Sequence, residues 1–181
     1  MATTFFLRDQ RIGIQGASLL RDERGGATQN LSVDTVAGGT WIVIQSWSTR
    51  PLTPFTLSGP INIRIRAAES NNVANTSIEC RIYKWSRVTG LSAALLTLKQ
   101  SVELTTTDSS VNLSGTPATT VFNSGEALIV DVGITNAPGT TMGGNRSVTI
   151  SYNGPTDGAS GDSYIQIDEN VVQRDRITVT E

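Results

Sequence analysis

Apolar and polar side chains alternate with a period of two along most of this 181-residue chain. In residues 61–66 (INIRIR), isoleucine takes every odd position, and asparagine and arginine take the even ones. In residues 78–85 (IECRIYKW), Ile78, Cys80 and Ile82 share one face, and the other face carries Glu79, Arg81, Tyr83 and Trp85. Because successive side chains of a strand point to opposite sides of a sheet, this alternation predicts strands with one face on a core.

Gly, Pro and Asn interrupt the alternation at short intervals after residue 40, which predicts a series of short strands. Residues 41–47 (WIVIQSW) are apolar on both faces at their start, so we expect a central or covered strand there. One helical turn stays an alternative for residues 91–98, because Ala93, Ala94 and Leu95 favour helix. The other expected strands lie near residues 96–104, 111–113, 119–122, 128–134, 148–152, 164–167 and 177–179.

Short strands at this spacing predict the fold class, an all-β, antiparallel β-sandwich. Several long connections favour a jelly-roll-like arrangement over an immunoglobulin-like one. The Cys–Trp–Cys core of the latter also requires two cysteines, and this sequence has one. A single domain of this length buries about 70% of its unfolded-state surface, so it needs no disulfide or metal to fold.

The first part of the chain differs from the rest. We expect an N-terminal arm and edge segment over residues 1–39, followed by a β-sandwich domain over residues 40–181. Apolar area left in water forfeits about 25 cal/mol per Å², so the apolar cluster at residues 5–7 should pack on something. Two interpretations stay open: a frayed terminus with an edge strand, or an extended arm that docks on another subunit or a larger assembly. In the second, the partner-binding residues are Phe5, Phe6, Leu7 and Arg8.

Composition and charge restrict the kinds of partner. Charged residues make up 17% of the chain, below the roughly 25% of typical globular domains. A net charge of −2 and a pI near 5.2 argue against a nucleic-acid partner. No segment approaches the roughly 20 apolar residues of a membrane span, so we expect no membrane partner. Cys80 falls on the isoleucine face, which predicts a small buried hydrophobe rather than a reactive thiol.

The sequence contains no histidine. This excludes Ser–His and Cys–His nucleophile pairs and most zinc sites. A pair of carboxylates could still form a glycosidase site, but the acidic residues lie in no recognisable motif. The loop at residues 157–162 lacks the spacing of an EF-hand and is expected to be an ordinary hairpin loop. We therefore predict that the chain is not an enzyme and has no catalytic residue, cofactor or metal ligand.

One surface carries the residue types that contact partners. The two segments at residues 61–66 and 78–85 place arginines and aromatic rings opposite their isoleucines. Arginine and aromatic residues are enriched at protein interfaces and also stack on sugar rings. An alternative, in which Tyr83 and Trp85 face the core or lie under a loop, stays open because a bulge near Lys84 would exchange the two faces. The candidate partner-binding sheet face consists of Arg64, Arg66, Arg81, Tyr83 and Trp85.

Residues 78–90 (IECRIYKWSRVTG), 122–132 (FNSGEALIVDV) and 152–170 (YNGPTDGASGDSYIQIDEN) resemble small virion structural proteins of tailed bacteriophages. The resemblance covers roughly residues 40–172 and rests on the general character of the sequence and on strand order. It is closest to head decoration (cement) proteins. This implies a location on the capsid exterior after synthesis in the host cytoplasm, the major capsid protein as partner, and a homotrimer. It supplies no catalytic residue.

A second function class stays open, a carbohydrate- or receptor-binding head of a phage tail fibre. Exposed Trp47, Tyr83 or Trp85 beside a shallow groove would favour it.

Overall fold

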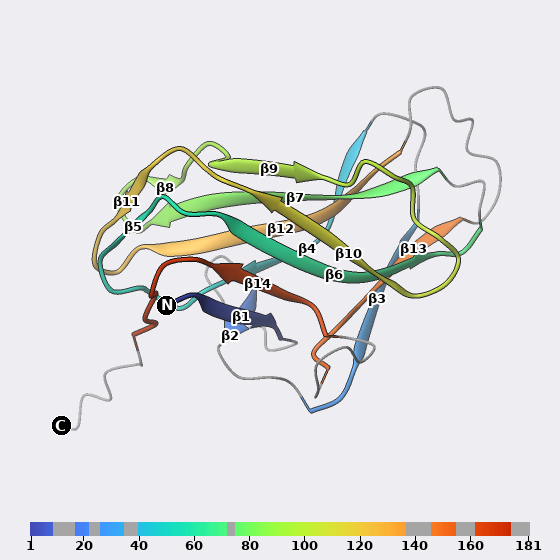
Figure 1. The fold of residues 1–181 in the computed structure, drawn as a ribbon, viewed down its shortest axis with the longest axis horizontal. Coiled ribbons are helices and arrows are strands. Elements are labelled where there is room, and N and C mark those ends of the chain that lie inside the picture. Colours follow the sequence, from blue (N-terminus) through green and yellow to red (C-terminus); the bar gives the residue numbers. More distant parts are fainter. Residues whose placement is uncertain are drawn as a thin grey trace.

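The computed structural model describes residues 1–8, 17–21, 26–34, 40–71, 75–136, 146–154 and 162–174. Within these ranges every regular element is a β-strand (Figure 1). The strands are β1 (Thr3–Leu7), β2 (Ser18–Arg21), β3 (Gln29–Asp34), β4 (Trp41–Ser48), β5 (Phe55–Leu57), β6 (Ile61–Glu69), β7 (Thr76–Ser86), β8 (Gly90–Leu91), β9 (Leu96–Lys99), β10 (Ser109–Gly115), β11 (Thr120–Phe122), β12 (Ala127–Asn136), β13 (Ser147–Tyr152) and β14 (Tyr164–Ile167).

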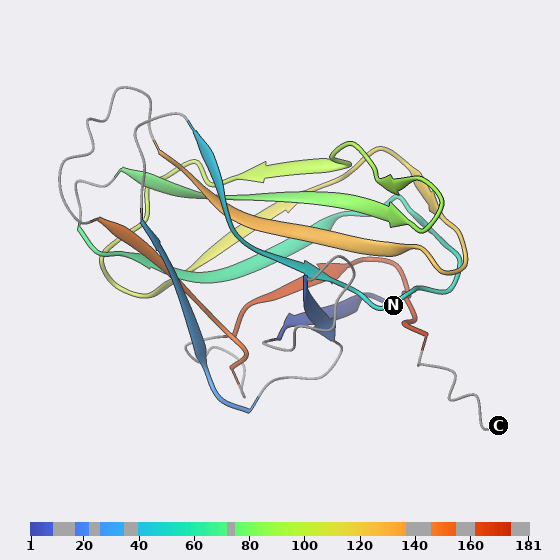
Figure 2. The same ribbon diagram turned by 180° about the vertical axis from the view of Figure 1, so that it is seen from behind.

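Most of these strands form two layers, which we name after their longest members. In the β6 sheet, β10 pairs with one side of β6, and β13 and β14 pair with successive parts of the other side; β3 and β1 then pair with β13 and β14. In the β7 sheet, β4 pairs with β12, β12 with β7, and β7 with both β8 and β9. Strand β2 joins the layers at one edge, and β5 and β11 form a separate pair. Figure 2 shows both layers from behind.

The predicted all-β, antiparallel sandwich is confirmed. In the described part of the chain, all the strand pairs are antiparallel except the short contact between β2 and β4. The chain passes repeatedly between the layers, from β6 to β7, from β9 to β10 and from β12 to β13. Such crossing between sheets is the jelly-roll-like feature, because an up-and-down arrangement would keep consecutive strands side by side.

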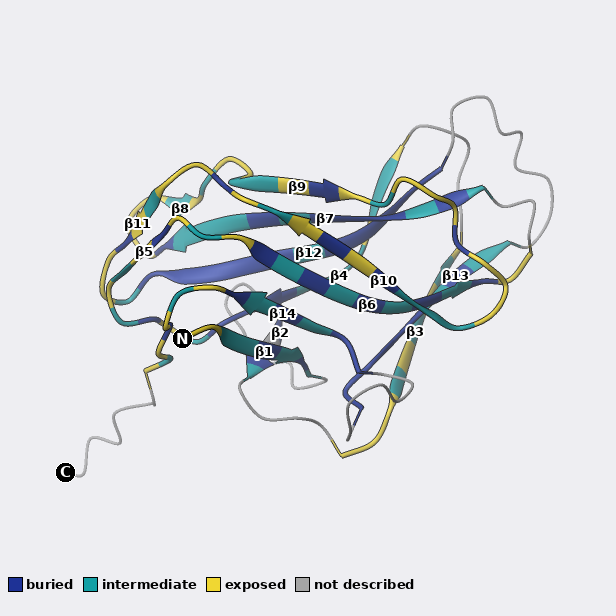
Figure 3. Ribbon diagram, in the orientation of Figure 1, coloured by how far each residue is buried: buried dark blue, intermediate teal, exposed yellow. Residues whose placement is uncertain are grey.

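The core lies between the layers and contains the isoleucine faces of both central strands. Ile61, Ile63 and Ile65 of β6 and Ile78 and Ile82 of β7 are at most 1% exposed. Figure 3 shows the alternation along β6, buried and half-buried residues in turn. Cys80 is buried beside these residues, and burial raises the pKa of its thiol far above the usual range. The prediction that Cys80 is a buried hydrophobe is confirmed.

Several expected boundaries differ from the structure. The long strand expected over residues 96–104 ends at Lys99, so β9 is four residues long. The alternative of a helical turn over residues 91–98 is wrong, because this region contains β8 and β9. The strand expected at residues 177–179 lies outside the described residues.

The predicted extended N-terminal arm is wrong for the residues that the structure describes. Residues 3–7 form β1, which pairs with β14 on one side and with β2 on the other. Phe5 is 1% exposed and Leu7 is fully buried in the chain's own core. Phe6 points to the outer side, where its ring meets Tyr164 edge-on with ring centroids 6.2 Å apart. The apolar cluster does pack against other residues, as expected, but those residues belong to this same sandwich.

Hydrogen bonds fasten β1 to the segment that follows β14. The Thr3 hydroxyl donates to the Glu169 carbonyl oxygen at 2.9 Å and accepts from the Val171 amide at 2.8 Å. The Glu169 carboxylate accepts hydrogen bonds from the backbone amides of Ser58 and Gly59. Burial alone would raise the pKa of Glu169, but these hydrogen bonds outweigh it and hold the pKa below its usual range. The first strand is therefore a fixed part of the fold.

Within the described part of the chain, no helix is long and apolar enough to cross a membrane.

Replacing Leu7 by alanine should lower the free energy of unfolding by about 2–5 kcal/mol, because it leaves a cavity in the core. Urea denaturation followed by tryptophan fluorescence measures this change. Leu91→Ala is the matched control, since Leu91 is 44% exposed. It should cost less than about 0.5 kcal/mol. Equal effects of the two substitutions would mean that β1 does not belong to the core in solution.

Candidate functional site

The five residues of the predicted sheet face do not share one surface. Arg64 and Arg66 lie on β6, whereas Arg81, Tyr83 and Trp85 lie on β7, and these two strands belong to different layers. Both strands turn their isoleucines toward the common core. Their other faces must therefore point in opposite directions. The prediction of a single surface is wrong, and two separate faces replace it.

Tyr83 and Trp85 lie on the outer side of the β7 sheet, and both are half-buried. Strand β7 pairs with β12 in an unbroken register, from Thr76 opposite Asn136 to Trp85 opposite Ala127. No bulge interrupts this pairing near Lys84, so the two faces of β7 are not exchanged. The alternative that placed Tyr83 and Trp85 in the core is wrong.

The β7 sheet carries an arginine stacked on a tryptophan. The guanidinium carbon of Arg81 lies 3.6 Å from the ring centroid of Trp41. Glu79 accepts a hydrogen bond of 2.8 Å from Nε of Arg81 and lies 2.7 Å from its second terminal nitrogen. Glu79 is itself 6% exposed and accepts a hydrogen bond from the Thr135 hydroxyl at 2.8 Å. Arg81 is therefore held on both sides, by a buried carboxylate and by an aromatic ring.

Tyr83 and Asp131 continue this arrangement along the sheet. Asp131 lies directly opposite Arg81 and accepts a hydrogen bond of 2.5 Å from the Ser46 hydroxyl. Burial raises the pKa of the Tyr83 phenol above its usual value; the Asp131 carboxylate adds to this, and Arg81 opposes it. The phenol therefore stays protonated at neutral pH. We name this surface the tryptophan–arginine face; it comprises Trp41, Glu79, Arg81, Tyr83, Trp85 and Asp131.

A glycine makes room for the tryptophan. A Cβ at Gly133 would meet Nε1 of Trp41 at 2.7 Å and the carbonyl oxygen of Ile42 at 2.3 Å. The register between β4 and β12 also shifts next to Gly133, which indicates a bulge. Both features let the indole of Trp41 lie close over the strand, where Arg81 stacks on it.

The β6 sheet presents a different chemistry. Across its outer side, Arg64 lies opposite Asn112 of β10 and Tyr164 of β14, and Asn62 lies opposite Ser114 and Gln166. These side chains surround a shallow hollow of about 300 Å³. We name this surface the amide face; it comprises Asn62, Arg64, Asn112, Ser114, Tyr164 and Gln166. Arg66 lies beyond the hollow and is paired with Asp108 at 3.2 Å.

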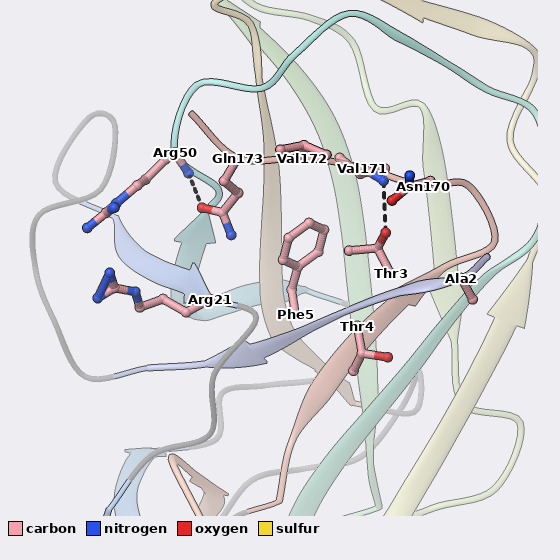
Figure 4. A pocket seen from close by; sticks show the side chains of 10 residues that line it. All are labelled: Ala2, Thr3, Thr4, Phe5, Arg21, Arg50, Asn170, Val171, Val172 and Gln173. Atoms are coloured by element: carbon pink, nitrogen blue, oxygen red, sulfur yellow. Dashed lines mark hydrogen bonds between the residues drawn. The ribbon is translucent and has the colours of Figure 1, made fainter. Parts of the chain in front are cut away.

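A larger cavity of about 610 Å³ lies between β1 and the segment that follows β14. Figure 4 shows Arg21 and Arg50 at one end, Thr3 and Asn170 at the other, and the ring of Phe5 between them. Both arginines already have interaction partners within the chain, so their charge is not available to this cavity alone.

Trp47 does not contribute to either face. Its side chain is fully buried, its indole N–H donates to the carbonyl oxygen of Arg8 at 3.0 Å, and its ring packs against Tyr152. Trp47 is therefore not one of the exposed aromatic residues that would favour the glycan- or receptor-binding alternative. Only the backbone of Arg8 takes part in this contact.

Sequence reasoning did not place Trp41, Glu79, Asp131 or Gly133 on the partner-binding face. One signal was present: Gly133 stands inside the strand expected at residues 128–134, and a lone glycine in a strand often marks a close approach. The stacking of Trp41 on Arg81 depends on the pairing of β4, β12 and β7, which no local pattern shows.

No protein-family model and no curated protein matches this chain. Solved structures do match. A CocE/NonD family hydrolase from Staphylococcus aureus aligns with a TM-score of 0.65 at 12% identity, over 94% of this chain and 36% of the hydrolase. An aminopeptidase from a marine sediment Thaumarchaeota archaeon aligns with a TM-score of 0.62 at 11% identity, over 96% of this chain and 37% of the enzyme. The chain thus spans little more than a third of either enzyme.

The infectious bursal disease virus structure (Gt strain) also matches, at 11% identity over 92% of this chain and 35% of the viral chain. The TM-score of this match is 0.39.

The match to hydrolases contradicts the prediction that the chain is not an enzyme. That prediction rested on the missing histidine, but this sandwich shares its fold with parts of a hydrolase and an aminopeptidase. At this level of identity the likeness shows the fold and assigns no activity to the chain.

Gly133→Ala should displace the indole of Trp41 and lower the free energy of unfolding by about 1–3 kcal/mol, because the added methyl group has no space. The tryptophan fluorescence spectrum and urea denaturation measure the two effects. Gly26→Ala is the matched control, since a Cβ at Gly26 meets nothing within 4 Å. An unchanged spectrum in Gly133→Ala would contradict the close contact between Gly133 and Trp41.

Proposed function

We propose that this chain is a structural β-sandwich of a virus particle, of the head-decoration type, which docks on the major capsid protein through the tryptophan–arginine face. In this proposal it lies on the capsid exterior as a homotrimer. The sequence resemblance to phage virion proteins supports the location and the partner. The observation that carries the proposal is Arg81, held between Glu79 and Trp41 beside half-buried Tyr83 and Trp85.

This surface has the properties of a protein-binding site. Tryptophan, tyrosine and arginine dominate the binding energy of protein interfaces. Ordering a flexible side chain on binding costs about 0.5–1.5 kcal/mol, and Arg81 avoids much of this cost because its partners already hold it. In a trimer three copies of the face would bind together, so modest contacts add up through a high effective concentration.

Trp85→Ala should weaken binding to capsids at least tenfold, which corresponds to about 1.4 kcal/mol. Co-sedimentation of the purified chain with particles assembled from the major capsid protein measures the dissociation constant. Asn112→Ala is the control, because Asn112 is exposed on the opposite layer. Undiminished binding by Trp85→Ala and by a Tyr83→Ala variant would contradict docking through this face.

The fold comparison supports a second candidate function, in which the chain forms part of a hydrolase. Its match to two enzymes at TM-scores of 0.62 and 0.65 favours this candidate. The chain would account for about a third of such an enzyme. Any base that it supplied would be a residue other than histidine, since the sequence has none.

If the chain itself carries this activity, the purified protein should hydrolyse p-nitrophenyl acetate or an aminoacyl p-nitroanilide faster than buffer alone. Release of the chromophore measures the rate. The same sample unfolded in urea is the control, because activity of a folded site disappears with the fold. Rates equal to buffer with both substrates would contradict this version of the candidate.

A further inference from the structure

The hollow on the amide face has the size of a small-ligand site. It is lined by residues of three adjacent strands, β10, β6 and β14, which lie side by side in Figure 1. Its volume of about 300 Å³ is at the lower end of the range for small-molecule pockets. This space suits one small ring rather than a large ligand or the surface of a partner protein.

The hydrogen-bonding groups of the hollow are arranged for a ligand with several hydroxyl groups. The Asn62 carbonyl oxygen accepts from the Ser114 hydroxyl at 2.7 Å, which leaves its NH₂ group as a donor. The Gln166 NH₂ group donates to the Thr4 hydroxyl at 3.3 Å, which leaves its carbonyl oxygen as an acceptor. The exposed amide of Asn112 adds both kinds of group. Fixed donors beside fixed acceptors match neighbouring hydroxyl groups, each of which donates and accepts.

An aromatic ring borders the same space. Tyr164 lines the hollow and is half-buried. Phe6 supports it from the next strand, with an angle of 69° between the two rings. A supported aromatic ring offers an apolar surface on which the C–H face of a sugar can pack.

The charge in the hollow favours an anion. Among the described residues that line it, Arg64 is the only charged one. Nε of Arg64 donates to the Ser110 hydroxyl at 3.1 Å, which orients the guanidinium, and a terminal nitrogen lies 4.0 Å from the Asp162 carboxylate. The Asp162 side chain is fully buried and does not line the hollow. A ligand there meets the guanidinium, whose planar donors match a carboxylate.

We propose that this hollow binds one unit of an acidic saccharide. Its carboxylate pairs with Arg64, its hydroxyl groups bond to Asn62, Asn112 and Gln166, and its ring packs on Tyr164. This inference goes beyond the proposed capsid docking, because the tryptophan–arginine face belongs to the opposite layer. A particle protein with both faces would bind capsid on one side and acidic glycan on the other.

Nuclear magnetic resonance titration of the full chain with D-galacturonic acid and with D-galactose tests the inference. We expect the acid to bind with a Kd of about 1 mM and at least fivefold more tightly than the neutral sugar. Arg64→Gln should remove this preference, and Asn112→Ala should weaken the binding of both sugars about threefold or more. Asn112 is exposed, so its variant folds even if the Arg64 variant does not.

Arg87→Gln is the matched control for charge, because Arg87 is exposed in the turn between β7 and β8. It should leave both affinities unchanged.

Three results would overturn the inference: equal affinity for the acid and the neutral sugar, full affinity in Arg64→Gln and Asn112→Ala, or displacement of the acid by an equal concentration of acetate. The last would mean a site for any carboxylate. Co-sedimentation of the Arg64→Gln variant with capsids separates this inference from the docking proposal. The variant should bind capsids as tightly as the unmodified chain does.

Discussion

The apolar contact between the two layers determines which side chains this molecule carries on its outer faces. Ile61, Ile63 and Ile65 of β6 and Ile78 and Ile82 of β7 bury their side chains in one common core. Because both strands bury these faces in the core, their polar faces must point in opposite directions. One set of arginines and aromatic residues thus becomes two surfaces with different chemistry.

The open edges of the sheets set the second constraint, because unpaired strand edges expose hydrogen-bonding groups that must find partners. Strand β14 pairs with β6 on one side and receives β1 on the other. The same pairing buries Phe5 and Leu7, so hydrogen bonding and apolar burial favour one arrangement. The hydrogen bonds of Thr3 then fasten β1 to the segment that follows β14, and the Glu169 carboxylate fastens that segment to Gly59.

The chain shares its fold with parts of hydrolases, and we propose partner and ligand binding for its two outer faces. These observations are compatible because a β-sandwich is a scaffold whose function resides in the residues on its surface. On the tryptophan–arginine face, Glu79 and Trp41 hold a cation in place. On the amide face, neutral amides and one arginine surround a hollow. The core supports both, since each face consists of residues that alternate with core residues.

The sequence by itself determined the fold class, the strands around residues 61–66 and 78–85, and the burial of Cys80, because each follows from period-two alternation within a segment. Which strands pair is a property of the whole chain, and only the tertiary structure decided it. It placed β6 and β7 in opposite layers, brought Trp41 over Gly133 to meet Arg81, and joined β1 to β14. The physical reason is that alternation specifies which side chains turn inward. The partner strand is instead selected by long-range hydrogen bonding and packing, which leave no local pattern.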